Sequence, residues 1–158
     1  MKKTFYLGLV TLFMIQSMMS QSFFETASKN EWEGKGELLG STASFRMNWE
    51  PILEGKFFRL SFQNQRDQSK EYIFRAMGVY QPNSDDTFTG TWFDSGGFSF
   101  PIKGSFSENE LVVYWGTPET EEGKTIYTIN EGGSVSVRDY VLKDGKLIQF
   151  GKASYEKQ

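Results

Sequence analysis

The sequence contains no histidine and no cysteine. Imidazole is the usual general base near neutral pH and the commonest metal ligand, so its absence excludes a Ser-His-Asp triad, a His-ligated haem and a His-containing zinc site. Without cysteine the chain forms no disulfide, no thiolate nucleophile and no Cys metal site. Any catalysis would depend on Asp, Glu, Lys, Tyr, Arg or Ser. We assign no catalytic residues and expect no metal site and no cofactor.

The sequence also lacks a basic run and a long apolar segment after residue 20. It has 17 Lys and Arg against 20 Asp and Glu. A mildly acidic domain is a poor binder of nucleic acids and of anionic membrane surfaces. We expect no nucleic-acid partner and no stable membrane insertion of the mature protein, and nothing in these residues identifies a protein partner.

Residues 1–20 have the order of a secretory signal peptide. The charged pair Lys2-Lys3 is followed by a mostly apolar stretch over residues 5–15, and then by small and polar residues. The apolar stretch is too short to span a bilayer. Cleavage after Ser20, within a residue or two, would leave one exported domain, periplasmic or extracellular, over residues 21–158. An uncleaved membrane anchor is the alternative.

From residue 30 onward the chain alternates apolar and polar residues, with turn residues at regular spacing. This pattern predicts an all-β domain of short antiparallel strands joined by hairpins. A meander of about ten strands closes most simply into a single up-and-down β-barrel, which leaves no exposed edge; a sandwich is the alternative. A short helical turn is expected within residues 22–29. The predicted strands are 31–39, 44–52, 56–63, 71–80, 87–94, 98–106, 111–116, 124–130, 134–142 and 146–155.

Three segments of the chain resemble a group of uncharacterised bacterial secreted proteins with lipocalin-like barrels. Residues 32–36 read W-x-G-x-G, residues 49–57 join a Trp to a Gly-Lys-Phe hairpin, and residues 143–150 are similar to that group's last hairpin. The resemblance implies the calycin architecture, an antiparallel barrel around a cavity, as in lipocalins, fatty-acid-binding proteins and nitrobindin. Nitrobindin-like barrels bind haem through a histidine near the C-terminus. This chain has no histidine, so the resemblance does not extend to haem binding.

Trp32 begins the first of these segments and is followed by Gly34 and Gly36. One interpretation places Trp32 at a ligand entrance. The favoured interpretation is structural: Trp32 closes one end of the barrel, and the glycines permit sharp strand curvature.

Large rings fall on the strand faces that the alternation assigns to the interior. They either line an apolar cavity, which would hold a ligand mainly by burial, or fill the barrel solidly. The inner face of the strand predicted at 71–80 is ambiguous, since both of its faces carry apolar residues. The predicted ligand-binding residues are Phe58, Leu60, Phe62, Phe74, Trp92, Phe100, Trp115, Asp139 and Gln149.

Asp139 interrupts an inner face otherwise made of valines. An inward carboxylate costs free energy unless it is paired or hydrogen-bonded, and burial raises its pKa. It either orients a ligand, acts as an acid or base, or has a structural role, through a bulge that turns it outward or a hydrogen bond to a neighbouring strand. Gln149, expected to point inward with Leu147, is its predicted neighbour.

These observations favour an exported, non-enzymatic barrel that binds a small apolar or amphipathic molecule. Two alternatives remain. An interaction or structural module would use the outer face, with an exposed patch including Phe57, Phe93 or Tyr114. A carboxylate-dependent enzyme would be centred on Asp139.

Overall fold

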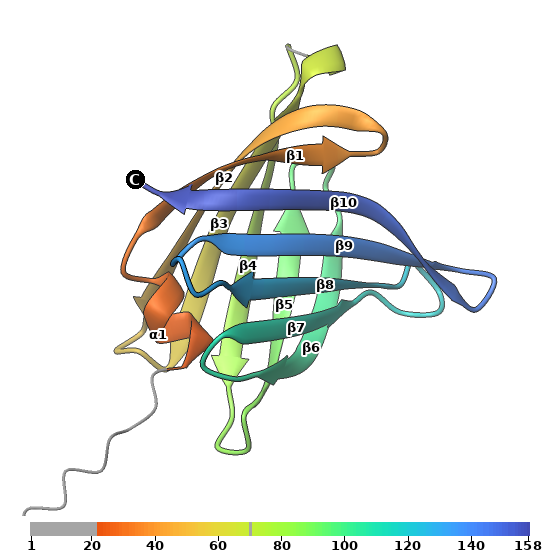
Figure 1. Ribbon diagram of the computed structural model, residues 1–158. Helices are drawn as coiled ribbons and strands as arrows, with labels where there is room; N and C mark the ends of the chain where they lie inside the picture. The colour runs from red at the N-terminus through yellow and green to blue at the C-terminus, as the bar shows by residue number, and fades with distance from the viewer. Residues whose placement is uncertain (1–21, 70) are drawn as a thin grey trace, which may run out of the picture.

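A computed structural model describes residues 22–69 and 71–158. Ten antiparallel strands form one closed barrel, in which each strand pairs with its neighbours in the sequence and β1 pairs with β10 (Figure 1). The prediction of an all-β, up-and-down barrel of ten strands is confirmed, and closure excludes the sandwich alternative. The predicted signal peptide lies outside the described residues.

The strands alternate in direction around the barrel, so their connections fall at two ends. Those at one end join β1 to β2, β3 to β4, β5 to β6, β7 to β8 and β9 to β10. The elements in order are α1 (Phe23–Ala27), β1 (Glu31–Leu38), β2 (Ser41–Ile52), β3 (Phe57–Arg66), η1 (Asp67–Ser69), β4 (Phe74–Pro82), β5 (Thr87–Asp94), β6 (Ser99–Phe106), β7 (Glu110–Trp115), β8 (Gly123–Ile129), β9 (Val135–Lys143) and β10 (Lys146–Lys157).

The period-two pattern sets which side chains enter the barrel. In β2, Phe45, Met47 and Trp49 are buried, while Arg46 between them is exposed. Arg46 forms an ion pair with Glu33 of β1, with 2.8 Å between Nε and Oε1. This strand thus presents apolar side chains to the interior and polar side chains to solvent.

At two positions on its inner face, the first strand approaches β10 too closely for a side chain. A Cβ at Gly34 would lie 2.7 Å from a ring carbon of Tyr155, and one at Gly36 would lie 2.0 Å from the carbonyl oxygen of Lys152. Both contacts are to β10. The glycines therefore let β1 close the barrel against the last strand.

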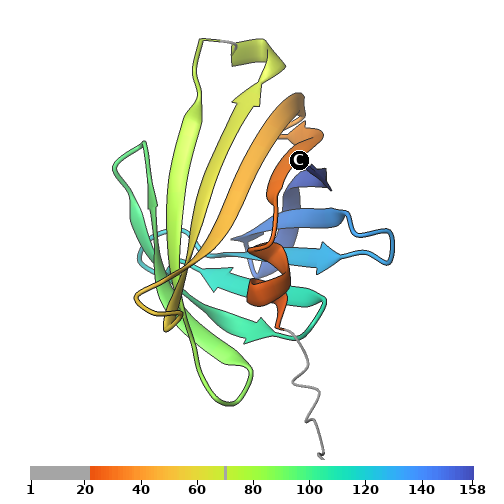
Figure 2. The ribbon, with the colours of Figure 1, turned by 90° about the vertical axis from the view of Figure 1, so that its left-hand side faces the viewer.

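One end of the barrel is closed by α1, which lies between the side formed by β2–β4 and the side formed by β6–β8 (Figure 2). Ser22 caps this helix: its hydroxyl accepts a hydrogen bond from the Glu25 backbone N–H, and the Glu25 carboxylate accepts one from the Ser22 N–H. The side chains of Phe23 and Phe24 are fully buried. The helical turn expected at residues 22–29 is present.

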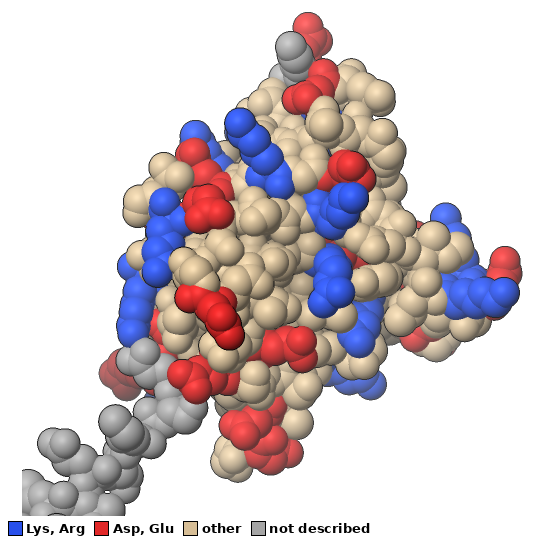
Figure 3. All heavy atoms as spheres, in the orientation of Figure 1, with Lys and Arg blue, Asp and Glu red and all other residues tan. Residues whose placement is uncertain are grey.

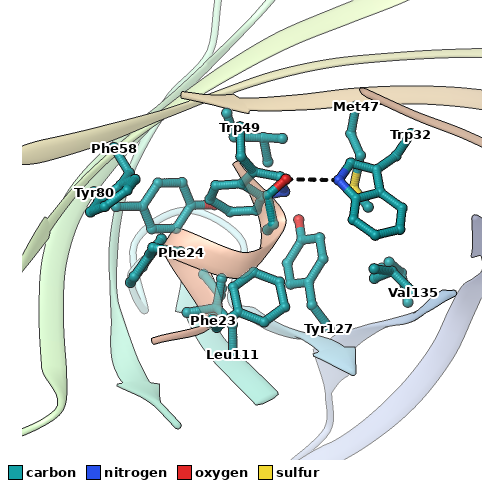
Figure 4. Packing of buried hydrophobic residues seen from close by; sticks show 14 of the residues in the cluster. Phe23, Phe24, Trp32, Met47, Trp49, Phe58, Tyr80, Leu111, Tyr127 and Val135 are labelled. Carbon is teal, nitrogen blue, oxygen red and sulfur yellow. Dashed lines mark hydrogen bonds between the residues drawn. The ribbon is translucent and has the colours of Figure 1, made fainter. Parts of the chain in front are cut away.

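The buried faces of α1 and the barrel make an aromatic core (Figure 4). Phe24 stacks on Phe58 with 4.9 Å between ring centroids, and Phe23 packs edge-on against Trp49 at 5.6 Å. The indole N–H of Trp32 donates to the Ala27 carbonyl at 2.9 Å. Trp32 therefore has a structural role, but a different one from that expected: it anchors the end of α1, and α1 closes this end of the barrel.

Charges of both signs are interspersed over the face of the molecule seen in Figure 3. Within the described residues, no helix has the length and apolar character needed to cross a membrane.

Candidate functional site

The half of the barrel away from α1 contains a cavity of about 320 Å³. This volume is at the lower end of the range for small-molecule sites, which is about 300–1,000 Å³. Leu39, Tyr72 and Glu121, from three connections at the end opposite α1, belong to its lining. The cavity is therefore reached from the end of the barrel that α1 leaves open.

The cavity wall is predominantly apolar and aromatic, with a few polar groups. Its lining residues are Leu38, Leu39, Phe45, Phe62, Asn64, Arg66, Tyr72, Phe74, Tyr80, Trp92, Phe100, Ile102, Val113, Trp115, Glu121, Thr125, Tyr127, Val137, Asp139, Phe150 and Tyr155.

Two groups of rings lie side by side in this wall, since Trp92 of the first is paired with Phe100 of the second across β5 and β6. Phe62 lies 6.0 Å from Trp92 and 6.4 Å from Phe74, measured between ring centroids. Phe100 lies 6.1 Å from Trp115. These spacings are typical of tilted and edge-to-face packing, so the rings support one another.

Tyr80 and Tyr127 separate the cavity from the aromatic core around α1. Their side chains hydrogen-bond to each other, and Trp49 lies behind them with its ring centroid 5.0 Å from Tyr80 and 5.6 Å from Tyr127. Burial raises the pKa of both phenols above the usual value, and so it does for Tyr155. All three hydroxyls therefore stay protonated at neutral pH.

Asp139 places one carboxylate in this apolar wall. The Thr125 hydroxyl of β8 donates a hydrogen bond to Asp139 Oδ1 at 2.7 Å. Burial raises the pKa of Asp139 to about 6, against the smaller opposing effect of that hydrogen bond. The side chain is nevertheless half-buried by surface area, because it lines the cavity. Of the alternatives for Asp139, the structure thus shows an inward carboxylate hydrogen-bonded to a neighbouring strand.

The prediction that Gln149 is the neighbour of Asp139 in the last strand was wrong. A β-bulge shifts the register of β10 between Gln149 and Gly151, so that Gly151 is paired with Asp139 and Gln149 with Tyr140. Gln149 therefore faces outward with Tyr140, and its amide donates to the Gly151 carbonyl at 3.3 Å. Leu147, also expected to face inward, is paired with the outward Leu142. Phe150, inside the bulge, lines the cavity.

The other predicted site residues divide between the two halves of the barrel. Phe58 and Leu60 point inward, but they are buried in the core around α1 and do not line the cavity. In the ambiguous strand β4, Phe74 and Tyr80 have the inward positions. The predicted residues that line the cavity are Phe62, Phe74, Trp92, Phe100, Trp115 and Asp139.

Several lining residues did not emerge from the sequence. Thr125, Tyr127 and Tyr155 occupy inward positions of their strands, so the alternation that placed the tryptophans could also have placed them. Leu39 and Glu121 lie in connections, where no periodicity indicates the direction of a side chain. The residues at the open end of the cavity could therefore not be predicted from the alternation of side chains.

The aromatic residues named for an outer patch lie apart from the cavity. Phe93 and Tyr114 are exposed, while Phe57 is half-buried. Met77 is directly opposite Phe93 in the register of β4 and β5 and is also exposed. Lys124 lies 5.4 Å from the ring centroid of Tyr114 and partly covers it.

Side chains suited to a metal do not gather in the described part of the chain: no three Asp or Glu residues there are placed to share an ion. No protein-family model matches the chain, and no curated protein matches it either. The closed ten-stranded barrel is consistent with a calycin-like fold. The cavity is therefore the feature from which a function can be inferred.

Proposed function

We propose that this protein is an exported, lipocalin-like barrel that binds a small apolar or amphipathic molecule and performs no catalysis. The observation that carries the proposal is the apolar cavity, which opens at one end of the barrel while α1 closes the other. A solidly filled interior would have left no place for a ligand.

Burial supplies the binding free energy in such a site. Each Å² of apolar surface removed from water contributes about 25 cal/mol, so about 200 Å² of ligand surface contributes roughly 5 kcal/mol before the entropic cost of binding. The wall is held in place by ring-to-ring packing and by the closed barrel, so little ordering is needed when a ligand enters.

The chemistry of the cavity supports binding more than catalysis. General acid–base catalysis usually pairs a proton donor with an acceptor near the reacting group, with pKa values near the working pH. Asp139 meets this condition, but the nearby phenols of Tyr80, Tyr127 and Tyr155 have pKa values raised above their usual range. We assign Asp139 to ligand recognition.

The test is to narrow the cavity without changing the outer surface. Val113 lines the cavity, whereas its neighbour Val112 faces outward on the same strand. We expect Val113→Phe to weaken binding of the neutral fluorescent probe N-phenylnaphthylamine at least tenfold. Val112→Phe is the matched control and should bind the probe like the parent protein.

Native mass spectrometry of the protein from its own host complements this titration, because a natural ligand would be retained as a discrete mass. Equal probe affinity in the two variants, or no binding of the probe or of any co-purified molecule, would contradict the proposal.

A further inference from the structure

We infer that the cavity selects ligands that carry a protonated amine on an apolar body, and that Asp139 receives the amine. This inference rests on the proposed function, because it specifies the ligand of the same cavity. It goes beyond burial, which by itself does not distinguish one apolar molecule from another.

In the described part of the chain, the Asp139 carboxylate accepts a hydrogen bond but has no cationic partner. Thr125 donates to one carboxylate oxygen. The ion pairs Arg46–Glu33, Arg59–Glu50 and Lys152–Glu37 join other residues of the described strands. Burial is the main cause of the raised pKa, and no cation opposes it. The carboxylate therefore has unused capacity to accept hydrogen bonds and to interact with a positive charge.

Filling the cavity changes the surroundings of this carboxylate. Before a ligand enters, the side chain is accessible from the cavity, so water solvates its charge. A purely apolar ligand removes that water and leaves a buried charge with one hydrogen bond, which is costly. A ligand with an ammonium group replaces the lost hydration with a charge-assisted hydrogen bond. The same site thus penalises a neutral ligand and favours a cationic one.

The neighbouring wall suits a cation as well. Trp115 extends over Gly123, where a Cβ would lie 2.0 Å from the indole ring, and Gly123 is two residues from Thr125 on β8. The indole is therefore close to the strand position that contacts Asp139. Aromatic faces attract alkylammonium groups through their quadrupole, and tryptophan does so best.

Acidic side chains gather on one connection at the open end: Glu119, Glu121 and Glu122 lie between β7 and β8, and Glu121 lines the cavity. Basic residues at neighbouring strand ends, Arg66, Lys143 and Lys146, offset part of this charge over the rim as a whole. The local negative charge beside the opening raises the concentration of cations there.

Arg66, the last residue of β3, favours the opposite ligand, an organic anion. It lines the cavity at the open end, where solvent and salt screen its charge. Asp139 interacts in a drier environment, where a charge has a larger effect. We therefore give Asp139 the greater weight, and the experiment includes an anion.

The experiment compares three probes with one apolar body: phenylbutylamine, phenylbutanol and phenylbutanoate. Calorimetric titrations of the parent protein at pH 7.5 should show the amine binding at least tenfold more tightly than the alcohol, and the carboxylate more weakly than either. Equal or tighter binding of the alcohol or the carboxylate would overturn the inference and leave the cavity's binding role intact. Failure of all three to bind would contradict the proposed function itself.

Asp139→Asn should reduce the amine-to-alcohol ratio of affinities to near one while the alcohol still binds. Glu131→Gln, which removes an exposed carboxylate in the β8–β9 turn at the closed end, should keep the parent's ratio. An amine preference that persists in Asp139→Asn would overturn the inference. Glu121→Gln, measured alongside, determines how much of the preference comes from the rim.

A pH series on the unaltered protein gives the same answer without a substitution. From pH 7 to pH 5 the affinity for the amine should fall about tenfold as Asp139 takes up a proton, while the affinity for the alcohol should not fall. The phenols of Tyr80 on β4, Tyr127 on β8 and Tyr155 on β10 lie near Asp139 and remain protonated throughout. The charged residues Arg66 and Glu121 line the same cavity at its open end. A pH-independent affinity for the amine would overturn the inference.

Discussion

Asp139 occupies a place that four neighbouring residues make possible. Thr125 supplies a hydroxyl donor, and Val137 and Val141 hold the strand against the interior. Gly151 supplies space, because a Cβ there would lie 2.9 Å from Asp139 Oδ2. The β-bulge in β10 puts this glycine opposite the carboxylate, so the irregularity in the last strand serves the geometry of the site.

Asp139→Asn should make the fold more stable at neutral pH and no more stable in acid. The carboxyl has a pKa of about 6 in the folded state and near 3.8 when unperturbed, so the folded state binds the proton more tightly. Stability is therefore lost as the pH rises from about 4 to 6, and the loss persists above that range. We expect the variant to gain on the order of 2–3 kcal/mol in unfolding free energy at pH 7.5.

Urea denaturation of both proteins at pH 4 and at pH 7.5 measures this difference. Asn keeps an oxygen that accepts from the Thr125 hydroxyl, so the substitution preserves the local hydrogen bond. A stability difference that is the same at both pH values would contradict the assignment of the raised pKa to Asp139.

At the scale of elements, the strands were predictable because one rule determines each of them. Side chains alternate across a strand, so a single correct assignment, such as Trp92 inward, also places its neighbours. The rule fails where one strand has an extra residue relative to its partner. The bulge between Gln149 and Gly151 inverts the faces of β10 beyond that point. A glycine within a strand often marks a bulge, so Gly151 was the available signal, but glycine alone does not distinguish a bulge from a close approach of two strands.

The importance of α1 was not predictable from periodicity. Five residues make too few turns to establish a repeat, so the residues expected to form a helical turn carried no indication of what they cover. The capping box at Ser22 and Glu25 is the local signal for the helix start. Phe23 and Phe24 close one end of the barrel because the strands leave room there for their rings. That room exists only in the folded barrel and leaves no pattern in the sequence.

Phe24→Ala should destabilise the protein severely. The Phe24 ring is fully buried and packs against Phe58, Tyr80 and Phe106, at centroid distances of 4.9, 5.6 and 5.1 Å. Removing it leaves a cavity under α1, and such truncations cost about 3–5 kcal/mol. Phe93→Ala, on the exposed face of β5, is the control and should cost less than about 1 kcal/mol. Equal midpoints in urea for the two variants would show that α1 is not an integral part of the core.

At the scale of the whole molecule, the barrel is filled at one end and hollow at the other. Both interpretations of the inward rings therefore hold, each in its own half: Phe58 belongs to the filled core and Trp115 to the cavity wall. The filled half supplies the stability that an interior cavity reduces, since cavities forfeit packing contacts. A barrel with this division can keep an unfilled site without a disulfide.

Pairing between β1 and β10 closes the barrel, and both the filled half and the cavity depend on it. Trp32 is paired with Lys157 and Leu38 with Gly151, so the ladder joins segments from opposite ends of the described chain. A chain that ends at Gly151 loses almost the whole ladder and the buried Tyr155 ring, and it leaves long edges on β1 and β9. Unpaired edges promote association between chains.

We therefore expect the protein truncated after Gly151 to aggregate or remain unfolded, whereas removal of Gln158 alone leaves a folded monomer-sized barrel. Gln158 contributes one backbone hydrogen bond to Glu31, which costs about 1 kcal/mol to remove. Size-exclusion chromatography and far-UV circular dichroism distinguish the two results. A truncated chain that retains a cooperative unfolding transition would show that nine strands close without the tenth, and that the cavity does not depend on pairing between β1 and β10.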